Sequence, residues 1–260
     1  MRVGTLGALD GKVVLVTGAS KGIGAAIASA CGAAGAAVVA HYGTDRAGAE
    51  AATADIPADR RLLLTADQSD PRAMDGLWRE AEAWRGRVDA TVLNAAIMLT
   101  TGGVEDDDAT WDDAWDRHWR INVLSPTRLM RNAVRHYLAV GGGVMVTISS
   151  WAAQRGTTNP DMMSYAASKA AVKAAAQSVA RGYARRNILS YVVAPGVVRT
   201  RMSEDFAALQ GGEDKVSATL AMGEWVPPSE IGELVAFLAT GKVRHLTGAT
   251  IDINGASYVR

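Results

Sequence analysis

Seven short apolar runs separate longer segments of helical composition along this chain, and that alternation restricts the fold more than any other feature. The apolar runs span residues 12–17, 36–42, 61–66, 87–95, 143–149, 188–194 and 250–255, and the helical segments include 22–34, 70–85, 109–138, 162–186 and 228–239. Uninterrupted apolar strands separated by helices are typical of a parallel sheet that is covered on both faces. Since crossover connections are right-handed, we expect an α/β fold, a doubly wound parallel sheet with helices on both faces.

The overall composition excludes several classes of protein. With 27 basic and 27 acidic side chains, the 260-residue chain has no basic excess of the kind that binds nucleic acid. Its one cysteine, Cys31, cannot form a disulfide within the chain and is predicted to be a small core residue, which fits a reducing compartment. We expect a single domain over residues 1–260, long enough to bury a core without metals or disulfides.

Two segments bear on membrane targeting. Residues 1–12 lack the apolar core of a signal peptide. The most apolar long stretch, residues 25–40, is too short to span a bilayer and is interrupted by Gly32 and Gly35. We therefore expect a cytoplasmic protein with neither a membrane nor a nucleic-acid partner.

Neither the acidic residues nor the histidines predict a metal site. The acidic run at 105–116 is interpreted as a solvated loop that leads into a helix, with Asp or Thr side chains capping the helix start. The four histidines, His41, His118, His136 and His245, are scattered along the chain and form no ligand set with metal-binding spacing.

A glycine-rich segment follows the first apolar run. Gly18, Gly22 and Gly24 form the pattern T-G-x-x-x-G-x-G between the run at 12–17 and a segment predicted to be an amphipathic helix. Glycines at these points permit a tight turn and a close approach of backbone to a pyrophosphate, and the helix N-terminus supplies amide donors. This strand–loop–helix context is the one required of a dinucleotide-binding site.

With this wider glycine spacing, the chain resembles the short-chain dehydrogenase/reductase family from about residue 12 to residue 255. Asp67 resembles the family's aspartate after the third strand, which contacts the adenine amino group. The tetrapeptide LNAA resembles the family's N-N-A-G and departs from it at Leu93 and Ala96, whereas Asn94 keeps the structural amide. The resemblance implies a Rossmann-like sheet and a cofactor-binding set of Gly18, Ser20, Lys21, Gly22, Ile23, Gly24, Tyr42, Thr44, Arg46, Asp67, Gln68, Asn94, Ala95, Ala96, Tyr165, Lys169, Pro195, Gly196, Val198 and Thr200.

The residue at the end of the second strand bears on the choice of cofactor. Tyr42 occupies the position where NAD-specific members of the family carry an aspartate. Lys21 and Arg46 are cations that could reach a 2′-phosphate, and Thr44 could donate a hydrogen bond to it. Asp45 is the contrary signal, unless it points to solvent or caps the next helix, and the two cations could also be ordinary surface charges. We expect NADP(H) to be preferred, with NAD possible.

Tyr165 and Lys169 are the candidate catalytic pair. They lie four residues apart in a helical segment and therefore share one helical face. A free tyrosine has a pKa of about 10, and a nearby ammonium favours the phenolate and lowers that pKa. In the family, the matching tyrosine is the acid/base of ketone reduction and the lysine also holds the nicotinamide ribose.

The resemblance adds two further catalytic residues and a cofactor-binding turn. Ser150 is predicted to hold the substrate oxygen, although the neighbouring Ser149 also qualifies. Asn122 matches the family's asparagine at a helix kink, which supports a proton relay; it could alternatively only satisfy backbone groups freed by Pro126. The segment 194–200 resembles the turn that lies under the nicotinamide, with Pro195 and Gly196 turning the chain and Val198 and Thr200 bonding the carboxamide.

The substrate pocket is expected to be apolar and adaptable. By the same resemblance, it is formed beside the catalytic serine, before the tyrosine and by a mobile lid at 201–226. The predicted substrate residues are Trp151, Met162, Met163, Met202 and Trp225, and each of them could instead belong to the core or to a subunit contact.

We therefore expect an oxidoreductase that transfers a hydride between NADP(H) and a hydrophobic ketone or secondary alcohol. The alternatives are a 3-oxoacyl-acyl-carrier-protein reductase, for which the arginines of residues 117–136 offer a basic docking patch, and a sugar dehydrogenase. A non-catalytic dinucleotide-sensing protein is the alternative from another class. The resemblance further implies a small-molecule substrate and a homotetramer or homodimer.

Overall fold

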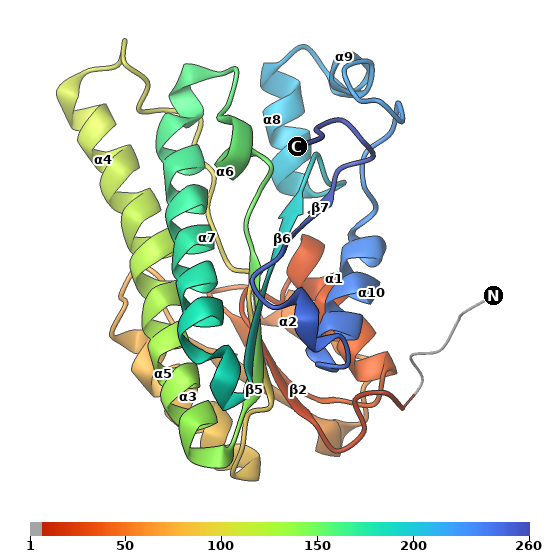
Figure 1. Ribbon diagram of the computed structural model, residues 1–260. Helices are drawn as coiled ribbons and strands as arrows, with labels where there is room; N and C mark the ends of the chain where they lie inside the picture. The colour runs from red at the N-terminus through yellow and green to blue at the C-terminus, as the bar shows by residue number, and fades with distance from the viewer. Residues whose placement is uncertain (1–6) are drawn as a thin grey trace.

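The computed structural model describes residues 7–260, and its framework is one sheet of seven parallel strands in the order β3-β2-β1-β4-β5-β6-β7 (Figure 1). The strands are β1 Val13–Val16, β2 Ala37–Tyr42, β3 Arg61–Thr65, β4 Ala90–Leu93, β5 Gly143–Ile148, β6 Ile188–Pro195 and β7 Thr250–Ile253. Every neighbouring pair is parallel, which confirms the predicted doubly wound sheet. Residues 1–6, which belong to the segment 1–12 considered for a signal peptide, lie outside the described residues.

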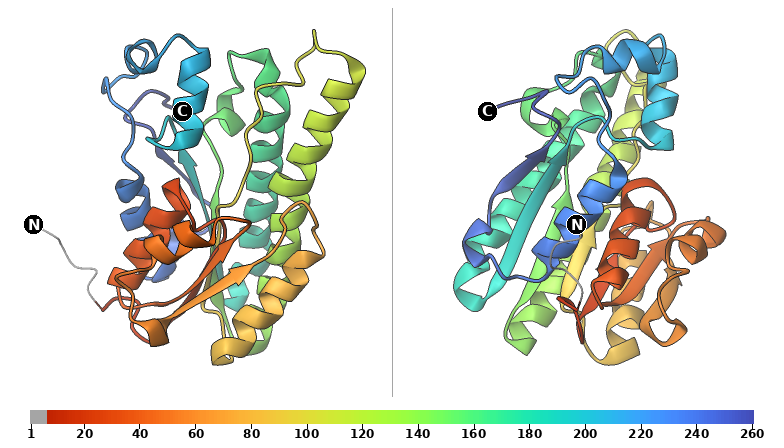
Figure 2. Two further views of the ribbon diagram at one scale, coloured as in Figure 1. Left: turned by 180° about the vertical axis from the view of Figure 1, so that it is seen from behind. Right: turned by 90° about the vertical axis from the view of Figure 1, so that its right-hand side faces the viewer.

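Helices cover both faces of the sheet. Helices α1 and α10 pack on one face, and α3, α5 and α7 pack on the other (Figures 1 and 2). The helices are α1 Gly22–Ala33, α2 Arg46–Ala52, α3 Ala73–Arg85, α4 Asp108–Trp119, α5 Ser125–Val140, α6 Ala152–Arg155, α7 Met163–Tyr183, α8 Arg201–Leu209, α9 Glu213–Ser217 and α10 Pro228–Ala239. Short 3-10 turns occupy Ala58–Arg60, Pro160–Met162, Ala184–Arg186 and Arg244–Leu246.

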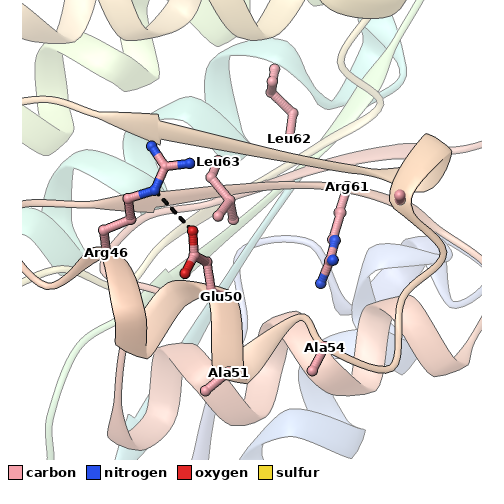
Figure 3. Close-up of a pocket in the computed structure, with 8 residues that line it drawn as sticks. Arg46, Glu50, Ala51, Ala54, Arg61, Leu62 and Leu63 are labelled. Atoms are coloured by element: carbon pink, nitrogen blue, oxygen red, sulfur yellow. Dashed lines mark hydrogen bonds and ion pairs between the residues drawn. The ribbon is translucent and has the colours of Figure 1, made fainter.

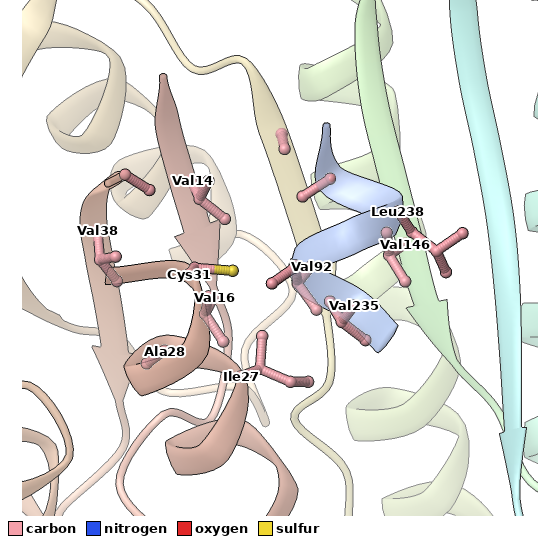
Figure 4. Packing of buried hydrophobic residues seen from close by; sticks show 14 of the residues in the cluster. Val14, Val16, Ile27, Ala28, Cys31, Val38, Val92, Val146, Val235 and Leu238 are labelled. Atoms are coloured by element: carbon pink, nitrogen blue, oxygen red, sulfur yellow. The ribbon is translucent and has the colours of Figure 1, made fainter. Parts of the chain in front are cut away.

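The central strand β1 is apolar on both of its faces. Val14 and Val16 belong to the cluster that includes Ile27 of α1 (Figure 4). Val13 and Leu15 belong to the cluster on the opposite face. A strand buried on both faces gains no stability from alternating polar residues, which is why its sequence is uninterrupted by them.

Cys31 is fully buried among the side chains between β1 and α1 (Figure 4). Burial raises the pKa of its thiol to about 12, so the reactive thiolate is scarce at neutral pH. The prediction that Cys31 is a small core residue is confirmed.

The predicted helical segment 109–138 is interrupted at Asn122, where the family resemblance places a helix kink. Helix α4 ends at Trp119, a π-helical turn occupies Arg120–Leu124, and α5 begins at Ser125 with Pro126 in its first turn. Proline has no N–H to donate to the preceding turn, and extra-wide turns of this kind occur where the regular ladder is interrupted. The interruption carries Asn122, which is almost completely buried.

The acidic run begins α4 as predicted. The Asp107 side chain accepts a hydrogen bond of 2.8 Å from the backbone N–H of Thr110 and so caps the helix.

No helix within residues 7–260 combines the length and the apolar character that crossing a bilayer demands.

The contact between α1 and α10 depends on a glycine. A Cβ at Gly232 would lie 2.6 Å from the carbonyl oxygen of Ala26, whereas a Cβ at Gly182, on α7, would meet nothing within 4 Å. We expect Gly232→Ala to lower the free energy of unfolding by about 1–3 kcal/mol, because the two helices must move apart. Gly182→Ala is the matched control and should leave stability equal or raise it by roughly 0.5–1 kcal/mol. Urea unfolding measures both, and a Gly232→Ala midpoint at or above that of the wild type would contradict this account of the packing.

Candidate active site

The candidate site lies at the carboxyl ends of the strands, beginning where β1 and β4 are neighbours. The Thr17 hydroxyl accepts hydrogen bonds from the backbone N–H groups of Asn94 at 2.9 Å and Ala95 at 3.1 Å. In return, the Asn94 amide donates to the carbonyl oxygens of Thr17 at 2.9 Å and Gly18 at 3.2 Å. A side chain at Gly24 would collide with the Gly18 carbonyl. The glycine loop is therefore held against the segment that follows β4.

The glycine loop leaves the N-terminus of α1 open. Gly18 and Gly22 have φ values of +66° and +56°, which favour glycine. Lys21 is the N-cap residue, and no side-chain hydrogen bond caps this helix end. A Cβ at Gly22 would lie 3.1 Å from the Thr200 side chain, so the loop also borders the segment after β6. Open amide donors at the start of a 12-residue helix suit an anionic group such as a pyrophosphate.

His41 is a buried residue whose contribution the sequence did not reveal. Its Nδ1 accepts a hydrogen bond of 3.2 Å from the Gly18 N–H, and its Nε2 lies 3.1 Å from the carbonyl oxygen of Ala66. A carbonyl only accepts, so Nε2 carries the proton and the ring is neutral. Burial lowers the pKa of His41, which favours the same form. The one feature of the sequence that could have indicated a role for His41 was its polar side chain in an otherwise apolar strand.

Asp45 caps α2, so its carboxylate already has a hydrogen-bond donor within the protein. Its carboxylate accepts a hydrogen bond of 2.8 Å from the Gly48 N–H, and the Ser20 hydroxyl donates to its carbonyl oxygen at 2.8 Å. Arg46 is exposed at the start of the helix, and its guanidinium donates to Glu50 at 2.9 Å. The hydrogen bond that Arg46 donates to Glu50, together with the proximity of the Tyr42 phenol, raises the pKa of Arg46.

An open pocket of about 700 Å³ lies between α2 and β3 (Figure 3). Arg46, Glu50, Arg61 and Leu63 are among its lining residues, and Arg61 also donates to the Thr53 carbonyl at 2.9 Å. None of the predicted catalytic residues lines this pocket, so its size does not identify the active site.

Asp67 and Gln68 follow β3. The Asp67 carboxylate accepts a hydrogen bond of 2.8 Å from the Ser69 N–H, which lowers the pKa of that carboxyl group. The Gln68 amide donates to the carbonyl oxygens of Ala95 and Ile121, at 3.1 Å each. Gln68 thus joins the segments after β3 and β4 to the π-helical turn.

Tyr165 and Lys169 are buried together on one face of α7. The Lys169 Nζ lies 5.9 Å from the centroid of the Tyr165 ring and donates to the Ile148 carbonyl at 3.0 Å. Burial lowers the pKa of Lys169 to about 8. Burial also raises the pKa of Tyr165, whereas a hydrogen bond with the Ser150 hydroxyl lowers it.

The two candidate serines have different partners. The Ser149 hydroxyl donates to the Lys169 carbonyl oxygen at 2.9 Å. The Ser150 hydroxyl lies beside the Tyr165 phenol and accepts a hydrogen bond of 3.1 Å from the Ala152 N–H. Ser150 is therefore the serine that shares a site with Tyr165.

Asn122 joins α7 to the segment after β4. Its Oδ1 accepts a hydrogen bond of 2.9 Å from the Ile97 N–H, and its Nδ2 donates to the Ile97 carbonyl at 2.9 Å and to the Ser168 hydroxyl at 3.0 Å. Ser168 immediately precedes Lys169, so Asn122 supports the part of the helix that carries the lysine.

His118, one helical turn before Asn122, has a similar set of partners. Its Nε2 accepts a hydrogen bond of 3.2 Å from the Leu99 N–H. Its Nδ1 lies 2.9 Å from the Ala114 carbonyl oxygen and 2.8 Å from the Ser164 hydroxyl. The imidazole stands edge-on to the Tyr165 ring at a centroid distance of 6.0 Å. The sequence reasoning missed this residue because only folding brings it beside the tyrosine.

Apolar side chains surround Tyr165. The buried cluster contains Ala152, Met162 and Ala166, with Met98, Trp151 and Phe206 packed against it. Trp151 and Met162 belong to the predicted substrate set, whereas Met98 comes from the segment after β4, which the sequence reasoning did not connect with the substrate.

The other predicted substrate residues, Met163, Met202 and Trp225, lie outside this cluster. Met163 is exposed and lines a groove of about 500 Å³ between α6 and α7, and Met202 is exposed on α8. Trp225 is buried against Leu220 and Ala207, with the Arg199 guanidinium 5.3 Å from its ring centroid. Their contact with substrate remains a prediction.

The segment after β6 reaches the same region. The Pro195 carbonyl accepts a hydrogen bond of 3.0 Å from the Trp151 N–H, next to Ser150. Val198 forms an isolated parallel bridge with Val226. Within residues 7–260, no group of three or more His, Cys, Asp or Glu side chains is arranged to hold a metal ion.

Known proteins resemble this chain in sequence and in fold over nearly its whole length. A family model described as Enoyl-(Acyl carrier protein) reductase matches residues 18–256. The 3-oxoacyl-acyl-carrier-protein reductase FabG of Escherichia coli is 33% identical over 250 residues, which cover 96% of this chain and 98% of that enzyme. A versicolorin reductase of Emericella nidulans is 33% identical over 262 residues, covering 96% and 97% of the two chains.

Two solved structures extend the comparison. A dehydrogenase/reductase from Sinorhizobium meliloti has a TM-score of 0.85 at 31% identity and covers 98% of both chains. A short-chain dehydrogenase/reductase from Serratia marcescens also has a TM-score of 0.85, at 33% identity, and covers 96% of this chain and all of its own.

The protonation of His118 predicts how stability depends on pH. Burial lowers the pKa of His118 from 6.5 to about 4. The unfolded chain therefore takes up a proton at a higher pH than the folded chain, and the free energy of unfolding should fall as the pH decreases from about 6.5 toward about 4. His118→Gln removes this proton uptake, so its stability should depend less steeply on pH.

Urea unfolding of the wild type and of His118→Gln between about pH 4.5 and pH 7 measures this difference. His41, whose pKa is also lowered, is present in both proteins, so the difference between the two slopes reports His118 alone. Parallel slopes would contradict the prediction.

Proposed function

The chain belongs to the short-chain dehydrogenase/reductase family, and on that premise we propose that it reduces hydrophobic ketones with NADP(H), using Tyr165 as its acid/base. Membership in the family makes it an NAD(P)-dependent oxidoreductase acting on CH–OH and C=O groups. The observation that carries the proposal is that three groups lie together at the carboxyl end of β5: the Tyr165 phenol, the Ser150 hydroxyl and the Lys169 ammonium.

The residues of the glycine loop fit a dinucleotide. Gly18 and Gly22 have left-handed backbone conformations, Gly24 has no room for a side chain, and the first turn of α1 has no side-chain cap. These features would let the backbone approach a pyrophosphate closely. The bound nicotinamide would supply or accept the hydride of the reaction. Thr200, which borders Gly22, would belong to the nicotinamide end of the same site.

The proton chemistry falls to Tyr165, Ser150 and Lys169. The Ser150 hydroxyl would hold the substrate oxygen, and the Tyr165 phenol would donate its proton to that oxygen or remove it in the reverse direction. A phenol in a buried site needs a nearby positive charge to release its proton near neutral pH. Lys169 would provide that charge, since a pKa of about 8 leaves it mainly protonated at pH 7.

The cluster around Tyr165 supports an apolar substrate. Met98, Trp151 and Phe206 pack beside the buried Met162 and Tyr165, so a ketone bound there would meet mostly hydrocarbon and aromatic surface. Phe206 belongs to α8, and we include residues 201–226 in the proposal as a lid. The positive φ values of Gly211 and Gly212, +94° and +102°, fit a hinge between α8 and α9.

A 3-oxoacyl-acyl-carrier-protein reductase is the second candidate, favoured by the 33% identity with the Escherichia coli enzyme of that name. Three arginines of the predicted docking patch already have acidic partners, since Arg117, Arg120 and Arg128 pair with Asp113, Asp116 and Asp75. This pairing reduces the charge available to an acidic carrier and is the reason that we place the small ketone first. Direct assay of an acyl-carrier substrate beside free ketones separates the two candidate functions.

We also include a homotetramer or homodimer in the proposal, as the family resemblance implies.

Replacing Tyr165 by phenylalanine tests the acid/base role. We expect turnover to fall roughly 10²- to 10⁴-fold, the usual contribution of a positioned acid/base, while cofactor binding is retained. Tyr183→Phe, on the same helix and partly exposed, is the matched control and should leave turnover unchanged. Steady-state kinetics with a panel of ketones and fluorescence titration of NADPH provide the measurements. Near-wild-type turnover in Tyr165→Phe would refute the mechanism.

Replacing Arg46 tests the cofactor preference. Asp45 is used to cap α2, and Tyr42 stands where an acid would repel a 2′-phosphate, so the exposed Arg46 is the expected phosphate partner. To reach the phosphate, its guanidinium would exchange the exposed ion pair with Glu50 for the new contact. Arg46→Ala should weaken NADPH binding by about 10-fold or more, the value of one charge-assisted hydrogen bond, and change NADH binding little. Arg131→Ala, an exposed arginine on α5, is the control. An equal loss for both cofactors would exclude a phosphate contact by Arg46.

A further inference from the structure

Two side chains on one helical face join the segment after β4 to the helix that carries Tyr165. Asn122 bonds to Ile97 and Ser168, and His118, four residues earlier, bonds to Leu99 and lies within hydrogen-bond distance of Ser164. We call these connections the Asn122 bridge and the His118 bridge. They are one helical turn apart and run between the same two parts of the molecule.

The bridges end beside different members of the catalytic pair. Ser168, at the end of the Asn122 bridge, immediately precedes Lys169. Ser164, at the end of the His118 bridge, immediately precedes Tyr165. The His118 ring also stands edge-on to the Tyr165 ring, with 6.0 Å between their centroids. His118 therefore touches the tyrosine both directly and through its neighbour in the chain.

The hydrogen-bond partners of His118 define its protonation state. The Ala114 carbonyl can only accept, so the proton is on Nδ1, and the Leu99 N–H can only donate, so Nε2 must carry a lone pair. A second proton on Nε2 would oppose the Leu99 N–H donor. Lys169, Arg117 and Tyr165 are the titratable groups near the ring, and the positive charges of the first two also disfavour protonation.

We infer that His118 is a positioning residue for Tyr165, holding the phenol at the distance from Ser150 and Lys169 that proton transfer needs. The inference rests on the proposed acid/base role of Tyr165. The ring is almost completely buried, and an apolar side chain of similar size would fill that space without needing three polar partners. A displacement of about 1 Å at a reacting group can lower turnover roughly 100-fold, so small movements of Tyr165 matter.

Replacing His118 by leucine removes the bridge while keeping an apolar side chain in the space. We expect kcat to fall about 10- to 100-fold, with KM for the ketone and Kd for NADPH changed less than about 3-fold, because the phenol is displaced and the binding surfaces are not. His118→Gln retains an acceptor for the Leu99 N–H and should recover part of the lost kcat.

His136 offers a matched control. It is also a buried histidine whose Nε2 accepts a backbone N–H, from Val88 at 3.2 Å, but it lies on α5 against Trp78, with Glu82 on its other nitrogen. His136→Leu should lower stability without lowering kcat. If His136→Leu lowers kcat as much as His118→Leu does, the effect is general destabilisation and the inference is wrong.

Ser164→Ala provides a second route to the same bridge if His118→Leu does not fold. It removes one hydroxyl from the end of the bridge, and a fall in kcat without a fall in NADPH affinity would support the inference. In the double variant with His118→Gln, the two losses should not multiply, because both act through one connection. Independent, multiplying losses, or a folded His118→Leu with kcat within about 2-fold of wild type, would overturn it.

The result of Tyr165→Phe separates this inference from the proposed function. If Tyr165→Phe is inactive and His118→Leu has normal kcat, only the positioning role fails. If Tyr165→Phe itself retains turnover, the acid/base assignment fails, and the positioning role fails with it.

Discussion

The hydrogen bonds between the carboxyl ends of β1 and β4 are the constraint on which the rest of the site depends. The Thr17 hydroxyl accepts hydrogen bonds from backbone N–H groups after β4, and the Asn94 side-chain amide donates to the backbone after β1. In the strand order, β1 separates β2 and β3 from the other strands, so the connections leave β1 and β4 in opposite directions and open a crevice there. The glycine loop and the segment leading to Ile97 and Leu99 take their positions from these bonds.

Burial then changes the protonation equilibria of the groups that the scaffold brings together. The pKa of Lys169 falls to about 8 because its ammonium is removed from water, and burial raises the pKa of Tyr165 for the same reason. Burial thus moves the two pKa values in opposite directions, because it disfavours the charged form of each group. The scaffold therefore contributes to the chemistry through its dielectric environment as well as through its geometry.

Buried histidines serve as hydrogen-bond acceptors in three places. His41 accepts from Gly18, His118 from Leu99 and His136 from Val88, and in each case the donor is a backbone N–H. A protonated ring could not accept these bonds, and burial disfavours the charged form of His41 and His118 as well. Each imidazole thus gives a hydrogen-bond partner to a backbone N–H that lies outside the helices and strands.

The sequence by itself determined the parallel sheet, the glycine loop and the Tyr165–Lys169 pair, because apolar runs and a four-residue spacing are properties of neighbours along the chain. It left Ser149 and Ser150 as alternatives, placed Asn122 at a helix kink only through the family resemblance, and found no function for His118. Only the tertiary structure decided these points. The hydroxyl partners of Ser149 and Ser150, and the bonds from His118 to Leu99 and Ser164, join residues 15 to 46 positions apart. Contacts at that separation depend on how helices and loops pack, and no local pattern in a single sequence records that packing.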